Sequence, residues 1–350
     1  MSNDPENVNE ELEELLANQK AQIKVFGVGG AGGNTLDRLS DVGVAGAETI
    51  ALNTDAQDLL NTSCDKKILI GKDLTKGLGA GSDPQIGEES ARENEREIKE
   101  ELEDVDMVFV TAGMGGGTGT GGAPVVADLA QKAGALTVGV VTTPFTMEGA
   151  RRIGNAEIGL DNMKKNVDTL IVIPNDKLLE LAPDLPLHQA FKLADEILTN
   201  AVKGITELVT KSGLVNTDFA DINTVMADGG LALIGTGESD SENRADESVE
   251  KALANPLLDV DIEGASGALI NVIGGPDMTL EEARSVVEKV SERLDEDAQV
   301  IWGARVDDEN EGSMELMVVV TGVTSDQIDQ PQTDKEREDV EEELGIEFVE

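Results

Sequence analysis

Cysteine, histidine and aromatic side chains are nearly absent from this sequence. Cys64 is the only cysteine among 350 residues, so no disulfide can form within the chain, and a reducing compartment is expected. His188 is the only histidine, which argues against a zinc site or a Ser-His-Asp triad, because both usually depend on histidine. The sequence therefore favours chemistry that needs neither thiols nor imidazoles.

Basic residues are scarce as well. The chain has 27 basic and 71 acidic residues, which gives a net charge of -44. Nucleic acids and anionic membranes attract basic surfaces, so we expect no nucleic-acid partner and no direct membrane insertion. The sequence also lacks long apolar runs, and its acidic N-terminus carries no basic segment of the kind found in secretory signals. These features predict a cytoplasmic protein.

The acidic residues are dispersed along the chain. They concentrate at 88–106, 238–250 and 281–297, with apolar segments of ordinary strand and helix length between these runs. Such apolar segments indicate a folded protein and not an acidic disordered one. Dispersed surface acid with few lysines is typical of proteins that stay soluble in a salt-loaded cytoplasm. We therefore hypothesise a halophilic, archaeal source.

Strand-like and helix-like segments alternate from residue 22 onward. This pattern favours an α/β fold built on a parallel, doubly wound sheet, in which ligands bind at the carboxyl ends of the strands. A long helix, apolar on more than one face, is expected from residue 188, followed after residue 229 by a smaller, separate α/β domain with four strands. We expect the strands at 23–28, 49–52, 67–70, 106–110, 135–141, 168–173, 231–237, 268–273, 299–306 and 315–320, and a long charged helix at 84–102.

The densest glycine cluster lies between the buried strand at 106–110 and a helix at 123–133. At a strand-to-helix turn, glycine lets backbone N–H groups approach a phosphate closely, and the helix N-terminus adds a favourable dipole. A flexible linker is the alternative, but linkers rarely join a buried strand to an amphipathic helix. The candidate phosphate ligands are Gly113, Met114, Gly115, Gly116, Gly117, Thr118, Gly119, Thr120 and Gly121.

A second glycine cluster, 27–34, follows the first strand and contains G-x-G-x-x-G. Alone it would indicate an NAD-binding Rossmann unit with Glu48 or Asp55 on the ribose. A dinucleotide fold has no use for another phosphate loop three strands later, whereas a nucleoside triphosphate can contact both loops. The Walker pattern G-x-x-x-x-G-K-[ST] is absent. The candidates in this cluster are Gly29, Gly30, Ala31, Gly32, Gly33 and Asn34.

Two further loops follow strands at the same edge of the predicted sheet. A glycine-dense turn at 77–83 precedes Pro84, a favoured first-turn residue of a helix. Its position favours contact with a terminal phosphate over a plain turn, and the candidates are Gly79, Ala80 and Gly81. Asn53 and Asp55 end the second strand and are candidates to hold phosphates and Mg²⁺, with a helix N-cap as the alternative for Asp55.

Side chains suited to guanine lie further along the chain. Asn175 and Asp195 can accept hydrogen bonds from the ring N–H and exocyclic amine of guanine, which adenine does not present together. Phe191 lies one helical turn before Asp195 and is a candidate to stack on the base, with ordinary core packing as the alternative.

The segment after the strand at 135–141 supplies three more candidates, Pro144, Glu148 and Arg152. Glu148 can accept from ribose hydroxyls, and Arg152 can meet phosphate or base. A capping acid and a surface cation are the alternatives for these two residues.

The heptad Gly-Gly-Gly-Thr-Gly-Thr-Gly at 115–121 resembles the signature of the tubulin and FtsZ family of GTPases. The resemblance is closest to FtsZ and covers about 23–322, including the three glycine loops. It implies that the chain binds GTP and GDP with Mg²⁺, with K⁺ as a further candidate cation. It also implies a GTPase that polymerises head to tail into the cell-division ring, at mid-cell in the cytoplasm.

The sequence Asn-Thr-Asp-Phe-Ala-Asp at 216–221 follows the long helix. That helix places the loop roughly 30 Å from the chain's own nucleotide, at about 1.5 Å per residue. The resemblance implies that Asn216, Asp218 and Asp221 enter the nucleotide site of the next protomer and polarise a water against the γ-phosphate. A helix cap formed by Asp218 or Asp221 is the alternative.

The sequence pattern also divides the chain into segments. Residues 1–20 form an acidic N-terminal extension with helical apolar spacing, and 323–350 form an acidic tail with a short apolar end. FtsZ tails of this kind engage membrane-anchoring adaptors, although this one lacks the Pro-Ala-Phe-Leu-Arg-like ending familiar from bacteria, and a functionless solvated end is the alternative. The remaining segments are a GTP-binding domain (21–187), the central helix (188–211), the catalytic loop with its following helix (212–229) and a C-terminal α/β domain (230–322).

The sequence leaves two alternative functions open. A nicotinamide-dependent oxidoreductase would rest on the cluster at 27–34 and predicts NAD binding without any response of assembly to GTP. A family paralogue that binds GTP but polymerises weakly would serve as a scaffold or regulator, and the intact Asp218 and Asp221 count against it.

Overall fold

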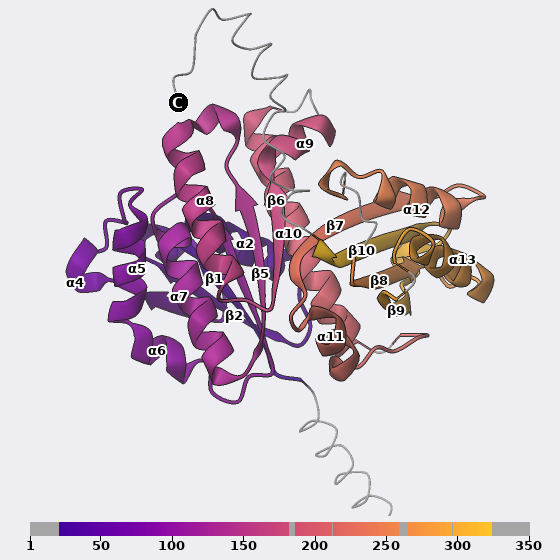
Figure 1. Cartoon of the computed structure of the whole chain (residues 1–350), viewed down its shortest axis with the longest axis horizontal. Coiled ribbons are helices and arrows are strands. Elements are labelled where there is room, and N and C mark those ends of the chain that lie inside the picture. The colour runs from indigo at the N-terminus through magenta and orange to yellow at the C-terminus, as the bar shows by residue number, and fades with distance from the viewer. Residues whose placement is uncertain (1–20, 182–185, 212, 259–264, 296, 324–350) are drawn as a thin grey trace, which may run out of the picture.

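The computed structural model describes residues 21–181, 186–211, 213–258, 265–295 and 297–323 (Figure 1). The expected N-terminal helix and the tail lie outside these residues. Ten strands form one sheet: β1 (Ile23–Val28), β2 (Ala47–Asn53), β3 (Lys66–Leu69), β4 (Met107–Gly113), β5 (Leu136–Thr143), β6 (Thr169–Pro174), β7 (Gly230–Ser239), β8 (Gly267–Gly274), β9 (Gln299–Val306) and β10 (Met314–Val323).

The helices cover both faces of this sheet. They are α2 (Gly29–Val42), α3 (Ala56–Asn61), α4 (Lys72–Thr75), α5 (Pro84–Glu93), α6 (Glu95–Glu100), α7 (Thr118–Ala133), α8 (Ala150–Lys164), α9 (Asn175–Leu181), α10 (Leu187–Thr210), α11 (Phe219–Met226), α12 (Arg244–Leu253) and α13 (Leu280–Ser291). Short 3₁₀ turns occur at η1 (Thr146–Glu148), η2 (Pro256–Leu258) and η3 (Asp308–Asn310). Within the described residues, no helix is both long enough and apolar enough to cross a bilayer.

The strand order is β3-β2-β1-β4-β5-β6-β7-β10-β8-β9. The strands from β3 to β7 pair in parallel, as the β-α alternation predicts, whereas β10 pairs antiparallel with β7 and β8. The four C-terminal strands were expected as a separate unit, but β7 continues the first sheet by pairing with β6 between Thr169↔Gly230 and Ile171↔Ala232. This pairing is short, so the sheet is continuous while the C-terminal half keeps its own helices.

Side chains alternate between the two faces of the parallel sheet. On β1, Val25 packs in the core under α2 and α10, whereas Phe26 and Val28 pack on the opposite face with residues of α5, α6, α7 and α8. The C-terminal strands and α12 and α13 enclose a third core. Each apolar face is therefore covered, as a doubly wound sheet requires.

Helix α10 connects the two halves of the molecule (Figure 1). Its residues Ala194, Leu198 and Ile205 share one core with strands of the first half and with Met317 and Val319 of β10. The expectation of a long helix buried on more than one face is confirmed. At about 1.5 Å per residue, its 24 residues span about 36 Å.

Three helix boundaries differ from the sequence prediction. The expected helix at 84–102 breaks at Asn94, whose side chain accepts a hydrogen bond from the Gly71 backbone N–H at 3.0 Å. Helices α2 and α7 begin at Gly29 and Thr118, so glycines expected in loops occupy first helical turns instead. Glycine disfavours helix in isolation, and only the packing of these turns against neighbouring backbone overrides that preference.

Candidate nucleotide site

A pocket of about 410 Å³ lies at the carboxyl ends of β1, β4, β5 and β6. Ligands of doubly wound sheets bind at this edge. The pocket brings together segments from both glycine clusters, the segment after β5 and the start of α10. Among the predicted residues it is lined by Gly29, Gly30, Ala31, Asn34, Gly113, Met114, Gly116, Gly117, Thr118, Gly119, Pro144, Glu148, Arg152, Asn175, Phe191 and Asp195.

Two helices begin in this pocket. The first residues of α2 and α7, Gly29 and Thr118, both line it. Unpaired N–H groups and the positive end of the helix dipole make a helix N-terminus favourable for an anion. The hydroxyls of Thr54 and Thr118 share a hydrogen bond of 2.6 Å, which joins the loop after β2 to the start of α7.

The glycines of the two clusters serve different purposes. A Cβ on Gly121 would lie 1.9 Å from the Pro84 carbonyl oxygen, and one on Gly32 would lie 2.6 Å from that of Thr111. Neither residue lines the pocket, so both are small because helices and strands pack closely there. Gly116 lines the pocket, and a Cβ built on it meets no atom within 4 Å. The packing of the protein therefore does not explain why residue 116 is glycine. A ligand that contacts the backbone at this position would explain it, because a side chain would occupy the same space.

Other predicted residues support the pocket without lining it. Asn53 donates to Asp58 at 2.6 Å, and Asp55 is the N-cap of α3, accepting from the backbone N–H groups of Gln57 and Asp58. The Thr120 hydroxyl accepts from the Gly115 N–H at 2.9 Å and so fixes the turn before α7. The remaining predicted residues outside the lining are Gly32, Gly33, Gly79, Ala80, Gly81, Gly115 and Gly121.

The end of the pocket near the starts of α9 and α10 contains one buried acceptor without a hydrogen-bond partner and one desolvated carboxyl group. The Oδ1 atom of Asn175 is buried and has no such partner. Asp195 is half-buried, and its burial raises the pKa of the carboxyl group to about 6, an effect that the positive charge of Arg38 partly opposes. A buried acceptor and a desolvated carboxylate both suit a ligand that donates hydrogen bonds.

Phe191 lies beside these two acceptors. Its ring packs edge-on against the buried Phe145, with ring centroids 5.1 Å apart and an interplanar angle of 86°. The residue is still 39% exposed, and it lines the pocket. Such an aromatic surface suits the flat face of a base.

Glu148 and Arg152 contact each other in this structure. They form an ion pair one helical turn apart, and Glu148 also accepts from the Phe145 backbone N–H at 2.9 Å. The capping alternative for Glu148 is therefore confirmed, while both residues also line the pocket. Their interaction with a ligand remains a prediction.

Several residues of the site are not among those predicted from the sequence. Val28, Ser82, Thr142 and Ala194 also line the pocket, and Thr54 supports it through Thr118. Thr142 lies near the carboxyl end of β5, so the rule that ligands bind at strand ends signals it. Ser82 adjoins the predicted glycine turn, but nothing in its local sequence distinguishes it from an ordinary turn residue.

The loop with the two carboxylates lies away from this pocket. Asp218 and Asp221 form a reciprocal cap at the start of α11, in which the Asp221 N–H donates to Asp218 at 2.8 Å and the Asp218 N–H donates to Asp221 at 3.3 Å. Asn216 accepts from the Gly213 N–H at 2.7 Å. All three side chains are exposed, and none lines the pocket. The capping alternative is therefore confirmed, and it leaves carboxylate oxygens available to solvent.

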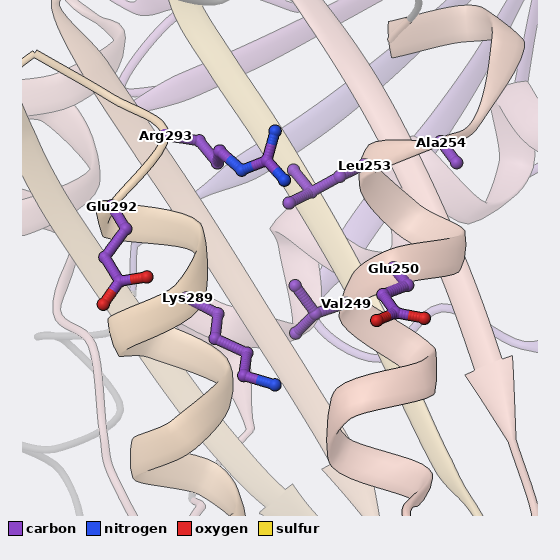
Figure 2. A pocket seen from close by; sticks show the side chains of 7 residues that line it. All are labelled: Val249, Glu250, Leu253, Ala254, Lys289, Glu292 and Arg293. Carbon is purple, nitrogen blue, oxygen red and sulfur yellow. The ribbon is translucent and has the colours of Figure 1, made fainter.

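Another cavity, of about 500 Å³, lies between α12 and α13 (Figure 2). It is lined near the C-terminal ends of both helices, by Val249, Glu250, Leu253, Ala254, Lys289, Glu292 and Arg293. Helix C-termini carry the negative end of the dipole and disfavour a phosphate. Although this cavity is larger, the pocket at the strand ends has the chemistry for a nucleotide.

Protein carboxylates do not form an evident metal centre in the described part of the chain, where no group of three or more His, Cys, Asp or Glu side chains is placed to hold an ion.

The sequence matches the GTPase domain of the tubulin/FtsZ family over residues 22–183 and the C-terminal domain of the FtsZ family over 230–324. It is 63% identical to cell division protein FtsZ 1 of Thermococcus kodakarensis, over 91% of this chain and 85% of that protein. Its identity to the FtsZ of Haloferax mediterranei is 58%, over 91% and 85% of the two chains.

A solved structure of an empty FtsZ dimer from M. jannaschii has a TM-score of 0.87, with 60% sequence identity over 92% of this chain and 93% of that one. These matches do not favour the oxidoreductase or the weakly polymerising paralogue. Together with the pocket, they show that this chain belongs to the FtsZ family of GTPases.

Proposed function

We propose that this FtsZ-family GTPase binds GTP in the pocket at the strand ends and completes its active site with the loop 216–221 of a neighbouring copy. The main support for this arrangement is the separation of the pocket from the loop within one chain. The pocket combines two helix N-termini with a buried, unpartnered acceptor on Asn175, while the exposed carboxylates of the loop lie beyond the opposite end of α10. A single chain holds both halves of a hydrolytic site but keeps them apart.

The base end of the pocket is suited to guanine. Asn175 Oδ1 and the Asp195 carboxylate offer acceptors for the ring N–H and the exocyclic amine, and Phe191 offers a ring face. Adenine has no ring N–H on its Watson–Crick edge, so it would leave a desolvated carboxylate unpaired. An unpaired buried polar group is costly, which gives the site its selectivity.

The phosphate end is built from backbone N–H groups and hydroxyls. Gly116, Gly117 and Thr118 line it at the start of α7, and Gly29 to Ala31 line it at the start of α2. Arg152 is the one cationic side chain in the described lining, and Glu148 already neutralises it. The charge of a triphosphate therefore calls for Mg²⁺, and the hydroxyls of Thr118 and Ser82, which line the pocket, would help to hold it. K⁺ is a further candidate, since molar salt is the expected medium.

Hydrolysis needs an attacking water in line with the γ-phosphate. In a head-to-tail stack, Asp218 and Asp221 of one copy would face the terminal phosphate held by the next, with Asn216 beside them. Their carboxylates would orient the water, whose oxygen forms the new bond to phosphorus while the bond to the β-phosphate oxygen breaks. The products are GDP and inorganic phosphate. Bound Mg²⁺ would supply charge stabilisation of the terminal phosphate.

Such a contact joins two different surfaces of identical chains. Heterologous contacts of this kind extend into open filaments. We place these filaments in the cytoplasm, at the division ring, in keeping with the division proteins that this chain resembles. The acidic tail, which lies outside the described residues, is proposed to engage a membrane-anchoring adaptor through its apolar end.

The substitution Asp195→Asn tests base recognition. Xanthine carries a carbonyl where guanine carries the exocyclic amine, so an amide at 195 can donate where the carboxylate accepts. We expect affinity for GTP to fall by about 10- to 100-fold, the effect of losing a charged hydrogen bond, and affinity for XTP to rise. Equilibrium binding of fluorescent GTP and XTP to the full-length protein, with Mg²⁺ in molar KCl, measures both.

The matched control is Asp161→Asn, which removes an exposed carboxylate from α8. It should leave both affinities unchanged. Unaltered GTP affinity in Asp195→Asn would show that this carboxylate does not recognise the base and would overturn the proposed orientation of the nucleotide.

A further inference from the structure

Asn155, on α8, connects two loops of the candidate site through a single side-chain amide. Its Nδ2 donates to the backbone carbonyl oxygen of Ser82 at 3.2 Å and to that of Gly115 at 3.3 Å. Ser82 belongs to the turn before α5, and Gly115 to the turn before α7. One amide group therefore links the two turns.

The turn that ends at Ser82 has a strained backbone. Lys76 and Ser82 have positive φ values of 58° and 60° although neither is glycine, and Gly77, Gly79 and Gly81 are also positive. Such conformations persist where the surroundings enforce them. The Gly79 N–H donates to the Thr54 carbonyl at 3.1 Å, which holds the middle of the turn, and Asn155 holds its end.

The two linked turns border the phosphate end of the pocket. Ser82 lines the pocket from one turn, and Gly116 and Gly117 line it from the other. The turns already touch, because a Cβ on Gly117 would lie 2.7 Å from the Ala80 Cβ and 2.9 Å from the Asp83 nitrogen. A shift of Ser82 relative to Gly115 would therefore change the space available to the outermost phosphate.

We propose that Asn155 is a positioning residue that fixes the distance between these two turns and thereby favours GTP over GDP. Asn155 does not line the pocket, so it acts through the carbonyl groups it binds and not by touching the nucleotide. The inference rests on the proposed function, because it requires the phosphates to lie between Ser82 and the turn at 115–117. The base end, at Asn175 and Asp195, is on a different element and is unaffected.

The test compares affinities for GDP and for GMPPCP, a triphosphate analogue that is not hydrolysed. Both are measured on the full-length protein with Mg²⁺ in molar KCl, below the concentration at which light scattering appears. Asn155→Ala should lower the ratio of triphosphate to diphosphate affinity by about tenfold, as expected for two lost neutral hydrogen bonds that are partly replaced by water. Affinity for GDP should stay the same, which also shows that the variant is folded.

Two further variants sharpen the comparison. Asn155→Gln retains an amide donor and should recover most of the ratio. Asn166→Ala removes a similar amide near the other end of α8, where Asn166 donates to the Asn162 carbonyl at 2.9 Å, and should leave the ratio unchanged. If Asn155→Ala does not fold, Asn155→Ser, which keeps one hydroxyl donor, should show an intermediate ratio.

An unchanged ratio in Asn155→Ala, or an equal loss of GDP and GMPPCP affinity, would overturn the positioning role while leaving the proposed function intact. Failure of the proposed function looks different, because the unmodified protein would then bind ADP as well as it binds GDP.

Discussion

At the scale of single residues, the most informative side chains are those left without partners. Asn175 has a buried, unpartnered oxygen, and burial raises the pKa of Asp195 to about 6. Both groups are less favourable in the empty protein than they would be beside a hydrogen-bond donor. We infer that these two groups form hydrogen bonds to a ligand when the pocket is occupied.

The raised pKa of Asp195 predicts a pH-dependent affinity for GTP. The carboxylate must be ionised to accept from guanine, and the donors of a bound base lower its pKa, so binding releases a proton near pH 6. Affinity should therefore be constant above about pH 7 and fall about tenfold per pH unit below the pKa. The raised pKa also means that ionisation of Asp195 disfavours the empty folded state as pH rises through 6.

Equilibrium titrations with fluorescent GDP between pH 5 and pH 8 measure this dependence. Binding of GDP to Asp195→Asn provides the control, because the amide does not titrate and residue 195 then adds nothing to the pH dependence. A flat profile for the unmodified protein would mean that the Asp195 carboxyl does not contact the base.

The base end of the site was predictable from the sequence, because the types of its polar side chains indicate their ligand. A carboxylate and an amide suited to guanine, Asp195 and Asn175, were predicted from sequence and do line one pocket. For Asp55 the N-cap alternative is confirmed, and Asn53 donates to Asp58, while contact of either residue with phosphates or Mg²⁺ stays a prediction. Short polar side chains after a strand look the same in sequence whether they cap a helix or hold a ligand.

At the scale of helices and strands, the glycine-rich turns show the same ambiguity. The sequence predicts that the whole stretch 113–121 is a phosphate loop. In the structure, α7 begins inside this stretch, at Thr118. Gly121 is needed where α7 crosses α5 and Gly116 where the pocket opens. Both positions are glycine in the sequence, and only the packing distances separate the two roles.

Alanine substitution at these two glycines should separate stability from binding. Gly121→Ala places a methyl group against the backbone of α5 and should cost about 1–3 kcal/mol of folding free energy, the usual range for overpacking. Gly116→Ala should change stability by less than about 0.5 kcal/mol, as surface substitutions do, yet weaken GTP binding at least about tenfold. Thermal unfolding without nucleotide and GTP titration report the two effects.

Each variant serves as the control for the other. Normal GTP affinity in Gly116→Ala would show that no ligand contacts the backbone at residue 116. The proposed phosphate site would then have to be assigned to other residues. Equal loss of stability in both variants would mean that Gly116 is also a packing residue.

At the scale of the whole molecule, α10 separates the pocket from the loop that we propose as the second half of the active site. Asp195 lines the pocket, and the 15 residues from there to the end of the helix at Thr210 span about 23 Å. The loop with Asp218 and Asp221 follows that end. The length of the helix allowed the distance between pocket and loop to be predicted from the sequence. The pairing of β6 with β7 was not predicted, because only a few residues pair there.

The reciprocal cap at α11 guides the choice of variant for this loop. Asp218 accepts from the Asp221 N–H, so Asp218→Ala would remove a helix cap as well as a carboxylate. Asparagine caps helices about as well as aspartate. Asp218→Asn therefore removes the charge while it preserves the loop, and its loss of activity can be assigned to chemistry.

The measurement that tests the shared active site most directly is GTP hydrolysis by a mixture of two inactive variants. The GTP concentration is held well below the weakened Kd of Asp195→Asn, so this variant has a largely empty pocket and an intact loop, whereas Asp218→Asn has an intact pocket and a defective loop. With random head-to-tail pairing in an equal mixture, about a quarter of the contacts join an intact pocket to an intact loop. We predict recovery of up to about a quarter of the unmodified activity per protomer, together with light scattering. A mixture no more active than its separate components would contradict the shared site.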